Sequence, residues 1–229
     1  MLIFAHLFVG AVIGILIAQA IRDNRAIYAC ILGSGISDIV DNPLGLIDPM
    51  FDAGRTVFHS LIVFIIFTII GVFVWKYRQN VIVVAIAIGI FLHQIVDTLW
   101  EVPGWWFFPF VNIGEGHFIN AGYFRDFFIV ELTTLSEWIF FIAIAVMVYN
   151  QIYENRIDLR ILISVVGIVI YMGIYSVLCE FLGTSCFFIP GWYSYGNLVL
   201  GIIAISGGFV YIITSPLKHN PVPTQTDEK

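Results

Sequence analysis

Charged residues are scarce in this chain, which has 229 residues, of which 11% are charged and 60% are hydrophobic. Soluble domains carry about 25% charged residues, so this composition excludes a sizeable soluble domain. Several apolar runs approach or exceed the ~18–20 residues that a helix needs to cross a bilayer. The shortage of charge therefore predicts an integral membrane protein that is almost entirely embedded.

Lysine and cysteine are also rare, and their positions exclude two further classes of protein. The three lysines, Lys76, Lys218 and Lys229, lie at predicted helix ends or in the C-terminal tail, whereas a retinal protein needs a lysine within a helix. The three cysteines form no Cys-x-x-Cys pair of the zinc-site type. Cys179 and Cys186 flank a short loop and could form a disulfide if that loop faces an oxidising compartment.

Hydropathy predicts an all-α fold, a polytopic transmembrane bundle of about seven helices. The last residues are polar and contain proline, so we expect residues 1–215 to form a single transmembrane domain and residues 216–229 a disordered cytoplasmic tail. The sequence shows no internal repeat. The expected helices span residues 2–21, 26–40, 57–75, 81–100, 126–149, 160–180 and 196–215.

Basic residues fall almost entirely on one side of this predicted topology. Only Arg55 and Arg125 lie on the side of the N-terminus. The positive-inside rule places the richer side in the cytoplasm, so we expect the N-terminus outside, the C-terminus inside, and a multi-pass protein of a prokaryotic plasma membrane. The eight basic residues on the cytoplasmic side are Arg22, Arg25, Lys76, Arg78, Arg156, Arg160, Lys218 and Lys229.

Histidines and aspartates gather at the opposite ends of the first four predicted helices. The topology brings all these ends to one membrane depth, where ionisable side chains are costly and mark functional sites by default. One histidine and one aspartate are four residues apart at the end of the fourth helix, so they share a helix face. The converging residues are His6, Asp38, Asp41, His59, His93 and Asp97.

Imidazole and carboxylate groups together favour zinc, manganese or iron(II) over calcium or magnesium. Six such groups are enough for a two-metal hydrolytic site, in which the ions lie ~3.5–4 Å apart. A bound metal ion lowers the pKa of its water towards ~7 and so supplies a hydroxide nucleophile. We therefore predict one or two divalent transition-metal ions at this cluster, with zinc preferred over manganese and iron.

Three nearby residues are candidates for catalysis. Asp97 or Glu131 could act as a general base. Arg55, which precedes His59 by four residues, could pair with an anionic phosphate or carboxylate group of a substrate. Glu137 lies deeper in the same predicted helix as Glu131, and we expect it to form hydrogen bonds between helices.

Each of these assignments has a simpler structural alternative. His6 could be an ordinary histidine at the membrane interface. The Asp38/Asp41 pair could form a solvated helix end before Asn42-Pro43, which would stop the helix. His59 could simply begin the third helix.

The motifs that carry these residues resemble those of the YdjM-like family of membrane-bound metal-dependent hydrolases. The family pattern has an early histidine, a Pro-Asp-x-Asp turn, a His-Arg-Gly-x-Thr-His-Ser segment, and a His-x-x-x-Asp motif followed by an aromatic-Pro pair. The resemblance covers about the first half of the chain and implies metal-dependent hydrolysis. The matching segments are His6, Ser37-Asp38-Ile39-Val40-Asp41, Gly54-Arg55-Thr56-Val57-Phe58-His59-Ser60, and His93 to Asp97 followed by Pro103-Gly104 and Phe108-Pro109.

The chain departs from the family pattern at three positions. Ser37 replaces the proline, Asp41 follows Asp38 by three residues instead of two, and Gly54 replaces the first histidine of the third motif. These positions bear on which residues act as ligands and on how many ions bind.

Two functions are compatible with the sequence. The first is a metal-dependent hydrolase at the outer membrane face that acts on a membrane lipid or a lipid-linked ester or phosphoester. The second is an ion- or proton-coupled transporter or channel, although the ionisable residues gather at one end and no inverted repeat is present. No nucleic acid partner is expected, and the sequence leaves the oligomeric state open.

Overall fold

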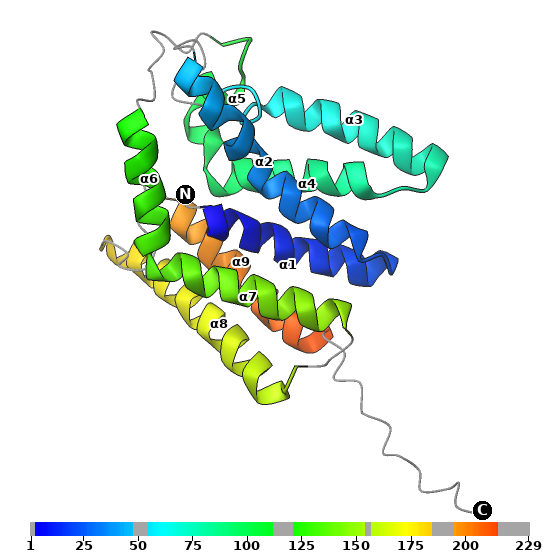
Figure 1. The fold of residues 1–229 in the computed structure, drawn as a ribbon, viewed down its shortest axis with the longest axis vertical. Helices are drawn as coiled ribbons and strands as arrows, with labels where there is room; N and C mark the ends of the chain where they lie inside the picture. The colour runs from blue at the N-terminus through cyan, green and yellow to red at the C-terminus, as the bar shows by residue number, and fades with distance from the viewer. Residues whose placement is uncertain (1–2, 48–54, 112–120, 154–156, 185–194, 215–229) are drawn as a thin grey trace, which may run out of the picture.

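The structure, a computed structural model, describes residues 3–47, 55–111, 121–153, 157–184 and 195–214. These ranges are all helical and contain no strand, which confirms the predicted all-α class (Figure 1). The tail 216–229, Gly54 and Cys186 lie outside the described residues, whereas Cys179 is buried. The helices are α1 (Ile3–Ile21), α2 (Arg25–Ile47), α3 (Leu61–Arg78), α4 (Ile82–Val96), α5 (Pro103–Trp106), α6 (Ala121–Thr133), α7 (Leu135–Ile152), α8 (Leu159–Leu182) and α9 (Gly196–Thr214), with a 3-10 turn, η2 (Leu99–Glu101), after α4.

Five described helices, α1, α3, α7, α8 and α9, are long and apolar enough to cross a membrane. α4 is apolar but shorter, and α2 carries several polar side chains near its end. Six of the seven predicted segments each correspond to one helix. The predicted end of the second helix at residue 40, and the alternative in which Asn42-Pro43 stops that helix, are wrong, because α2 continues past Pro43 to Ile47. Proline at this position removes one backbone N–H but leaves the later turns intact.

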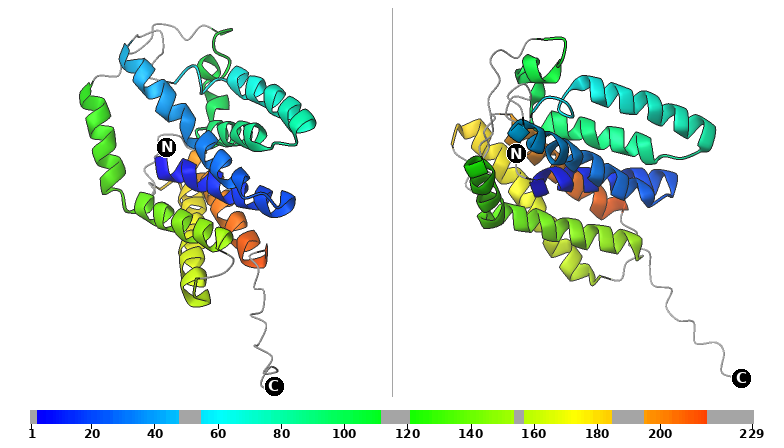
Figure 2. Two further views of the ribbon diagram at one scale, coloured as in Figure 1. Left: turned by 45° about the vertical axis from the view of Figure 1, so that its right-hand side comes forward. Right: turned by 45° about the horizontal axis from the view of Figure 1, so that its top comes forward.

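The prediction of one continuous helix over 126–149 was also wrong. The helix breaks at Thr134, whose backbone is extended (φ −81°, ψ 117°), and separates into α6 and α7. The Thr133 and Thr134 hydroxyls donate to carbonyls one turn back, a local bonding pattern that competes with regular helix geometry. As a result α6 lies across the end of the bundle (Figure 2) instead of continuing along it.

Close contact between α2 and α4 forms the part of the bundle that carries the histidines. α2 packs against both α1 and α4, and α3 packs on α4. A Cβ atom at Gly33 would collide with the carbonyl of Ile86, and one at Gly89 would collide with the carbonyl of Cys30. Glycine therefore allows the two backbones to approach closely, as small residues do in membrane helix pairs. α7, α8 and α9 complete the bundle around α1.

Candidate metal centre

Four elements bring six ionisable side chains together at one end of the bundle. α1 contributes a histidine from its first turn, and α2 contributes two aspartates. The segment before α3 contributes a second histidine, and α4 contributes a third with its C-terminal aspartate. Five of these side chains are at most 2% exposed, and Asp38 is 12% exposed. The cluster contains the six residues predicted as metal ligands: His6, Asp38, Asp41, His59, His93 and Asp97.

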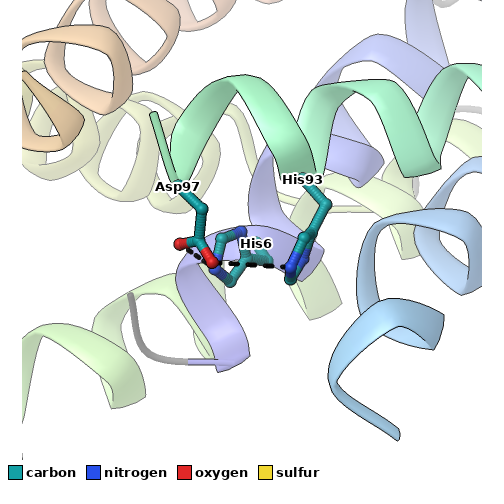
Figure 3. Close-up of side chains that lie close together, drawn as sticks. All are labelled: His6, His93 and Asp97. Atoms are coloured by element: carbon teal, nitrogen blue, oxygen red, sulfur yellow. Dashed lines mark ion pairs between the residues drawn. The ribbon is translucent and has the colours of Figure 1, made fainter. Parts of the chain in front are cut away.

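Five of the six form two groups of three that could each hold a metal ion. His6, His93 and Asp97 form the first group, which Figure 3 shows, and Asp38, His59 and His93 form the second. Within each group, one ligand atom of each residue lies within 4.8 Å of the others. His93 belongs to both groups, so the two candidate positions lie side by side.

The Asp97 carboxylate faces three histidines. Its Oδ1 lies 3.2 Å from His6 Nε2, and its Oδ2 lies 3.6 Å from His93 Nε2 and 3.9 Å from His59 Nε2. On the other side of the cluster, Asp38 Oδ1 lies 3.6 Å from His59 Nε2 and 4.0 Å from His93 Nε2. These nitrogen and oxygen atoms thus converge on one small volume.

The outer nitrogens of two histidines are held by acceptors. His59 Nδ1 lies 2.8 Å from Asp41 Oδ2, and His93 Nδ1 lies 2.8 Å from the backbone carbonyl of Ser34. A carbonyl and an ionised carboxylate can only accept hydrogen bonds, so Nδ1 is the donor in both rings. In a neutral imidazole the other nitrogen, Nε2, then carries a lone pair that points into the cluster.

The centre of the cluster is consequently crowded with acceptors. The two Nε2 atoms of His59 and His93 lie 3.1 Å apart, and both face the carboxylates of Asp38 and Asp97. Only a proton or a cation among these atoms can offset the repulsion between them. Metal-ligating histidines have the same arrangement, with one nitrogen towards the ion and the other donating to a carbonyl or carboxylate. The donor set therefore fits a metal ion.

His6 provides a second observation that fits a metal ion. Its ring stacks on that of His93, with centroids 4.1 Å apart. Neither of its nitrogens makes a hydrogen bond to the described residues, although Nε2 is close to Asp97, because the contact lacks hydrogen-bond geometry. A buried polar group without a hydrogen bond is costly. A bound metal ion would give His6 Nε2 a partner.

Asp41 belongs to neither group of candidate ligands. Its carboxylate accepts hydrogen bonds from the backbone N–H groups of Phe58 (2.8 Å) and His59 (3.1 Å) and faces the His59 ring nitrogen. The nearby Ser37 hydroxyl donates to the Phe58 carbonyl at 3.2 Å. The two departures from the family pattern that the structure describes thus both hold the backbone that presents His59.

One partner of His93 and one buried amide beside it carry no clear signal in the sequence. The Ser34 carbonyl is a backbone group that any residue would supply, so only the packing of α2 on α4 reveals it. Gln94 follows His93 directly and is buried. Its amide donates to the Ser60 carbonyl at 2.9 Å and accepts from the Trp106 indole at 3.1 Å. In the sequence, the one hint of a role for Gln94 is that this amide directly follows a candidate ligand in an apolar segment.

The two other candidates for catalysis belong to neither group of candidate ligands. Arg55 places its guanidinium 5.4 Å from the centre of the Trp105 ring, a cation–π arrangement. Glu131 is buried, and its carboxylate accepts from the backbone N–H groups of Ile3 (3.1 Å) and Phe4 (3.2 Å). The catalytic roles of both residues stay predictions.

Glu131 shares this task with Glu137. The Glu137 carboxylate accepts from the N–H groups of Phe4 (2.6 Å) and Ala5 (3.3 Å), which confirms the expected hydrogen bonds between helices. The first N–H groups of a helix have no partner within the helix and carry a partial positive charge, so carboxylates stabilise them. The two glutamates therefore fix the start of α1 immediately before His6.

A cavity of about 370 Å³ adjoins the cluster. It lies between the first turn of α1, the later turns of α2, and α6. Asp38 and Glu131 both contribute to its wall.

Comparison with known proteins gives one match. The family model of the YdjM inner membrane protein matches residues 1–180, which extends well beyond the first half of the chain on which the resemblance rests. Neither the curated proteins nor the solved structures contain a significant match. Five membrane-spanning candidates agree with a multi-pass inner membrane protein. Because the match covers more than half of the chain, this protein belongs to the YdjM inner membrane protein family.

Proposed function

We propose that this protein is a membrane-embedded metal-dependent hydrolase whose His/Asp cluster holds one or two divalent transition-metal ions, with zinc as the first candidate. The observation that carries the proposal is the pair of inward-facing Nε2 atoms of His59 and His93, 3.1 Å apart and surrounded by carboxylate oxygens. Nitrogen and carboxylate ligands of this kind suit zinc, manganese or iron. When bound, such an ion supplies hydroxide at neutral pH by lowering the pKa of its water.

The chain's own residues divide into ligands and groups that position them. His6, His93 and Asp97 would hold one ion, and Asp38 with His59 would complete the site or hold a second ion. One imidazole nitrogen binds one ion at a time, so His93 would serve only one of two ions. The two oxygens of Asp97 face different histidines. Asp41 keeps the His59 lone pair directed inwards.

The substrate that fits this position is a lipid or a lipid-linked ester or phosphoester. Five of the six clustered side chains are at most 2% exposed, so a large water-soluble substrate has no direct approach to them. Arg55 would pair with an anionic phosphate or carboxylate near the start of α3. Glu131, in the cavity wall, or Asp97 would accept the proton during hydrolysis.

The distribution of buried charge favours hydrolysis over transport. Among the described residues, the buried histidines, aspartates and glutamates all lie at the site end of the bundle, where α1 begins and α4 ends. A proton or cation relay would need such groups along the whole path. Apart from Arg55 and Arg125, the basic residues of the described helices lie at helix ends on the opposite side, so we also propose that the site faces the outer leaflet.

Elemental analysis of the purified protein tests the proposal. We expect one or two transition-metal ions per chain in the wild type and less than one tenth of this content in His93→Ala, which removes the ligand common to both groups. His219→Ala, a histidine in the C-terminal tail, is the control and should retain the metal. Wild-type protein that contains no transition metal, and binds none when zinc, manganese or iron(II) is added, would refute the proposal.

A further inference from the structure

The cavity beside the cluster is lined almost entirely by apolar surface, with three polar residues at its border. Its volume of about 370 Å³ lies within the ~300–1,000 Å³ typical of small-molecule sites. The three polar residues are Asp38, Asn42 and Glu131. The remaining lining residues are apolar and come from α1, α2 and α6: Ile3, Phe4, Ile39, Pro43, Phe128 and Leu132.

Asp38 connects this cavity to the candidate metal centre. Its carboxylate lies 3.6 Å from His59 Nε2 and also lines the cavity. It is the most exposed of the six clustered side chains, at 12%. A molecule in the cavity would therefore meet the cluster through this carboxylate, with Glu131 on the same wall.

Exposed apolar side chains of α2 and α6 border the cavity. α6 lies across the site end of the bundle (Figure 2), and its described side chains from residue 128 to 130 are 43–57% exposed and apolar. Ile39, on the α2 side of the cavity, is 62% exposed. In a chain that spans the membrane, such surfaces contact hydrocarbon chains. A ligand that is apolar at one end and polar at the other can enter here without crossing water.

We propose that the cavity between α1, α2 and α6 binds one hydrocarbon chain of the substrate lipid and places its polar end at Asp38 and Glu131. This inference rests on the proposed hydrolase function and specifies it. The hydrocarbon chain enters from the bilayer between α2 and α6. The bond to be cleaved then lies where the hydrocarbon chain joins the head group, next to the ligand carboxylate.

Photo-crosslinking locates the bound hydrocarbon chain independently of catalysis. The probe is a C16 alcohol with a diazirine in its chain, added to the full-length protein in lipid nanodiscs and mapped by mass spectrometry. We expect labelling of residues 39–43 and 128–132 that excess unlabelled C16 alcohol removes. Labelling of the exposed face of α3, at Ile69 and Phe73, should not be removed and serves as the bulk-lipid reference.

Two variants of α6 provide a matched pair. Leu132→Trp introduces bulk into the cavity, and Val130→Trp introduces the same bulk at a residue that is equally exposed, 43%, but does not line it. The competable labelling should fall to the α3 reference level in Leu132→Trp and stay unchanged in Val130→Trp. Labelling that no competitor removes, or that both variants change alike, would overturn the inference.

Failure of the hydrolase proposal gives a different result from failure of the cavity to bind a hydrocarbon chain. The metal-free His93→Ala variant should still show competable labelling, because the cavity does not depend on the metal. Leu132→Trp should lower kcat/KM for a C16 ester at least tenfold but leave a C4 ester of the same head group unchanged. If the wild type hydrolyses neither ester nor phosphoester while labelling persists, the cavity binds a lipid that is not a substrate, and the inference as stated is wrong.

Discussion

Replacement of Asp41 by asparagine separates the orientation of a ligand from ligation itself. The Asp41 carboxylate accepts two backbone N–H groups and faces His59 Nδ1 at 2.8 Å. An asparagine amide has nearly the same shape, but its nitrogen is a donor. When that nitrogen faces the ring, it favours the histidine tautomer with a proton on Nε2, which points into the cluster and cannot bind a metal.

The expected loss of metal affinity for Asp41→Asn is 10- to 100-fold, the usual effect of removing a partner that orients a ligating histidine. This corresponds to about 1.4–2.8 kcal/mol. Leaving a buried donor without an acceptor costs a further ~1–3 kcal/mol of folding stability. The two costs are measured separately, by competition for zinc with a chromogenic chelator and by thermal unfolding of the metal-free protein in detergent.

Asp23→Asn is the control for this substitution. Asp23 lies in the turn between α1 and α2, at the opposite end of the bundle, where it pairs with Arg25 at 2.8 Å. The Asp23→Asn variant also loses a carboxylate, but Asp23 touches no candidate ligand. The zinc affinity of this variant should therefore equal that of the wild type. If folded Asp41→Asn binds zinc as tightly as Asp23→Asn, the Nδ1–H tautomer assigned to His59 is wrong.

Three further predictions follow from the same geometry. His6→Ala should weaken zinc binding measurably but less than His93→Ala, because His6 belongs to only one of the two ligand groups; equal losses in a chelator competition would contradict this. Zinc binding should decrease as the pH falls, because protons compete with the metal for the imidazole nitrogens, and pH-independent affinity between pH 5 and pH 8 would argue against histidine ligation. Gly89→Ala should lower both thermal stability, by about 1–3 kcal/mol, and metal content, because its Cβ would collide with the Cys30 carbonyl. Gly167→Ala, where no atom lies within 4 Å of the added Cβ, should lower neither.

The match to the family and the geometry of the cluster support each other. The family model covers residues 1–180, and every candidate ligand lies within its first 97 residues. Residues further along also support the site, because Glu131 and Glu137 hold the first turn of α1. A role for the second half of the chain therefore follows from contacts far apart in sequence, which motif comparison does not detect.

Some features of the fold could not be read from hydropathy. The run 126–149 is apolar enough for one helix, and the break at Thr134 depends on local hydroxyl bonds and on the contacts of Glu131 and Glu137 with α1. Likewise, Asn42-Pro43 is a typical helix stop, yet α2 continues past it to Ile47. Tertiary contacts and local backbone bonding outweigh residue preferences of about 1–3 kcal/mol.

The sequence by itself determined the membrane class and the meeting of six ionisable residues, because the lengths of apolar runs set the helices and alternate helix ends meet at one depth. It did not determine the task of each residue. Asp38 and Asp41 are three residues apart and chemically identical, yet Asp38 faces two Nε2 atoms and Asp41 binds the back of His59. Only the packing of α2 against α4 and against the segment before α3 decided this, because it sets which atoms each carboxylate can reach.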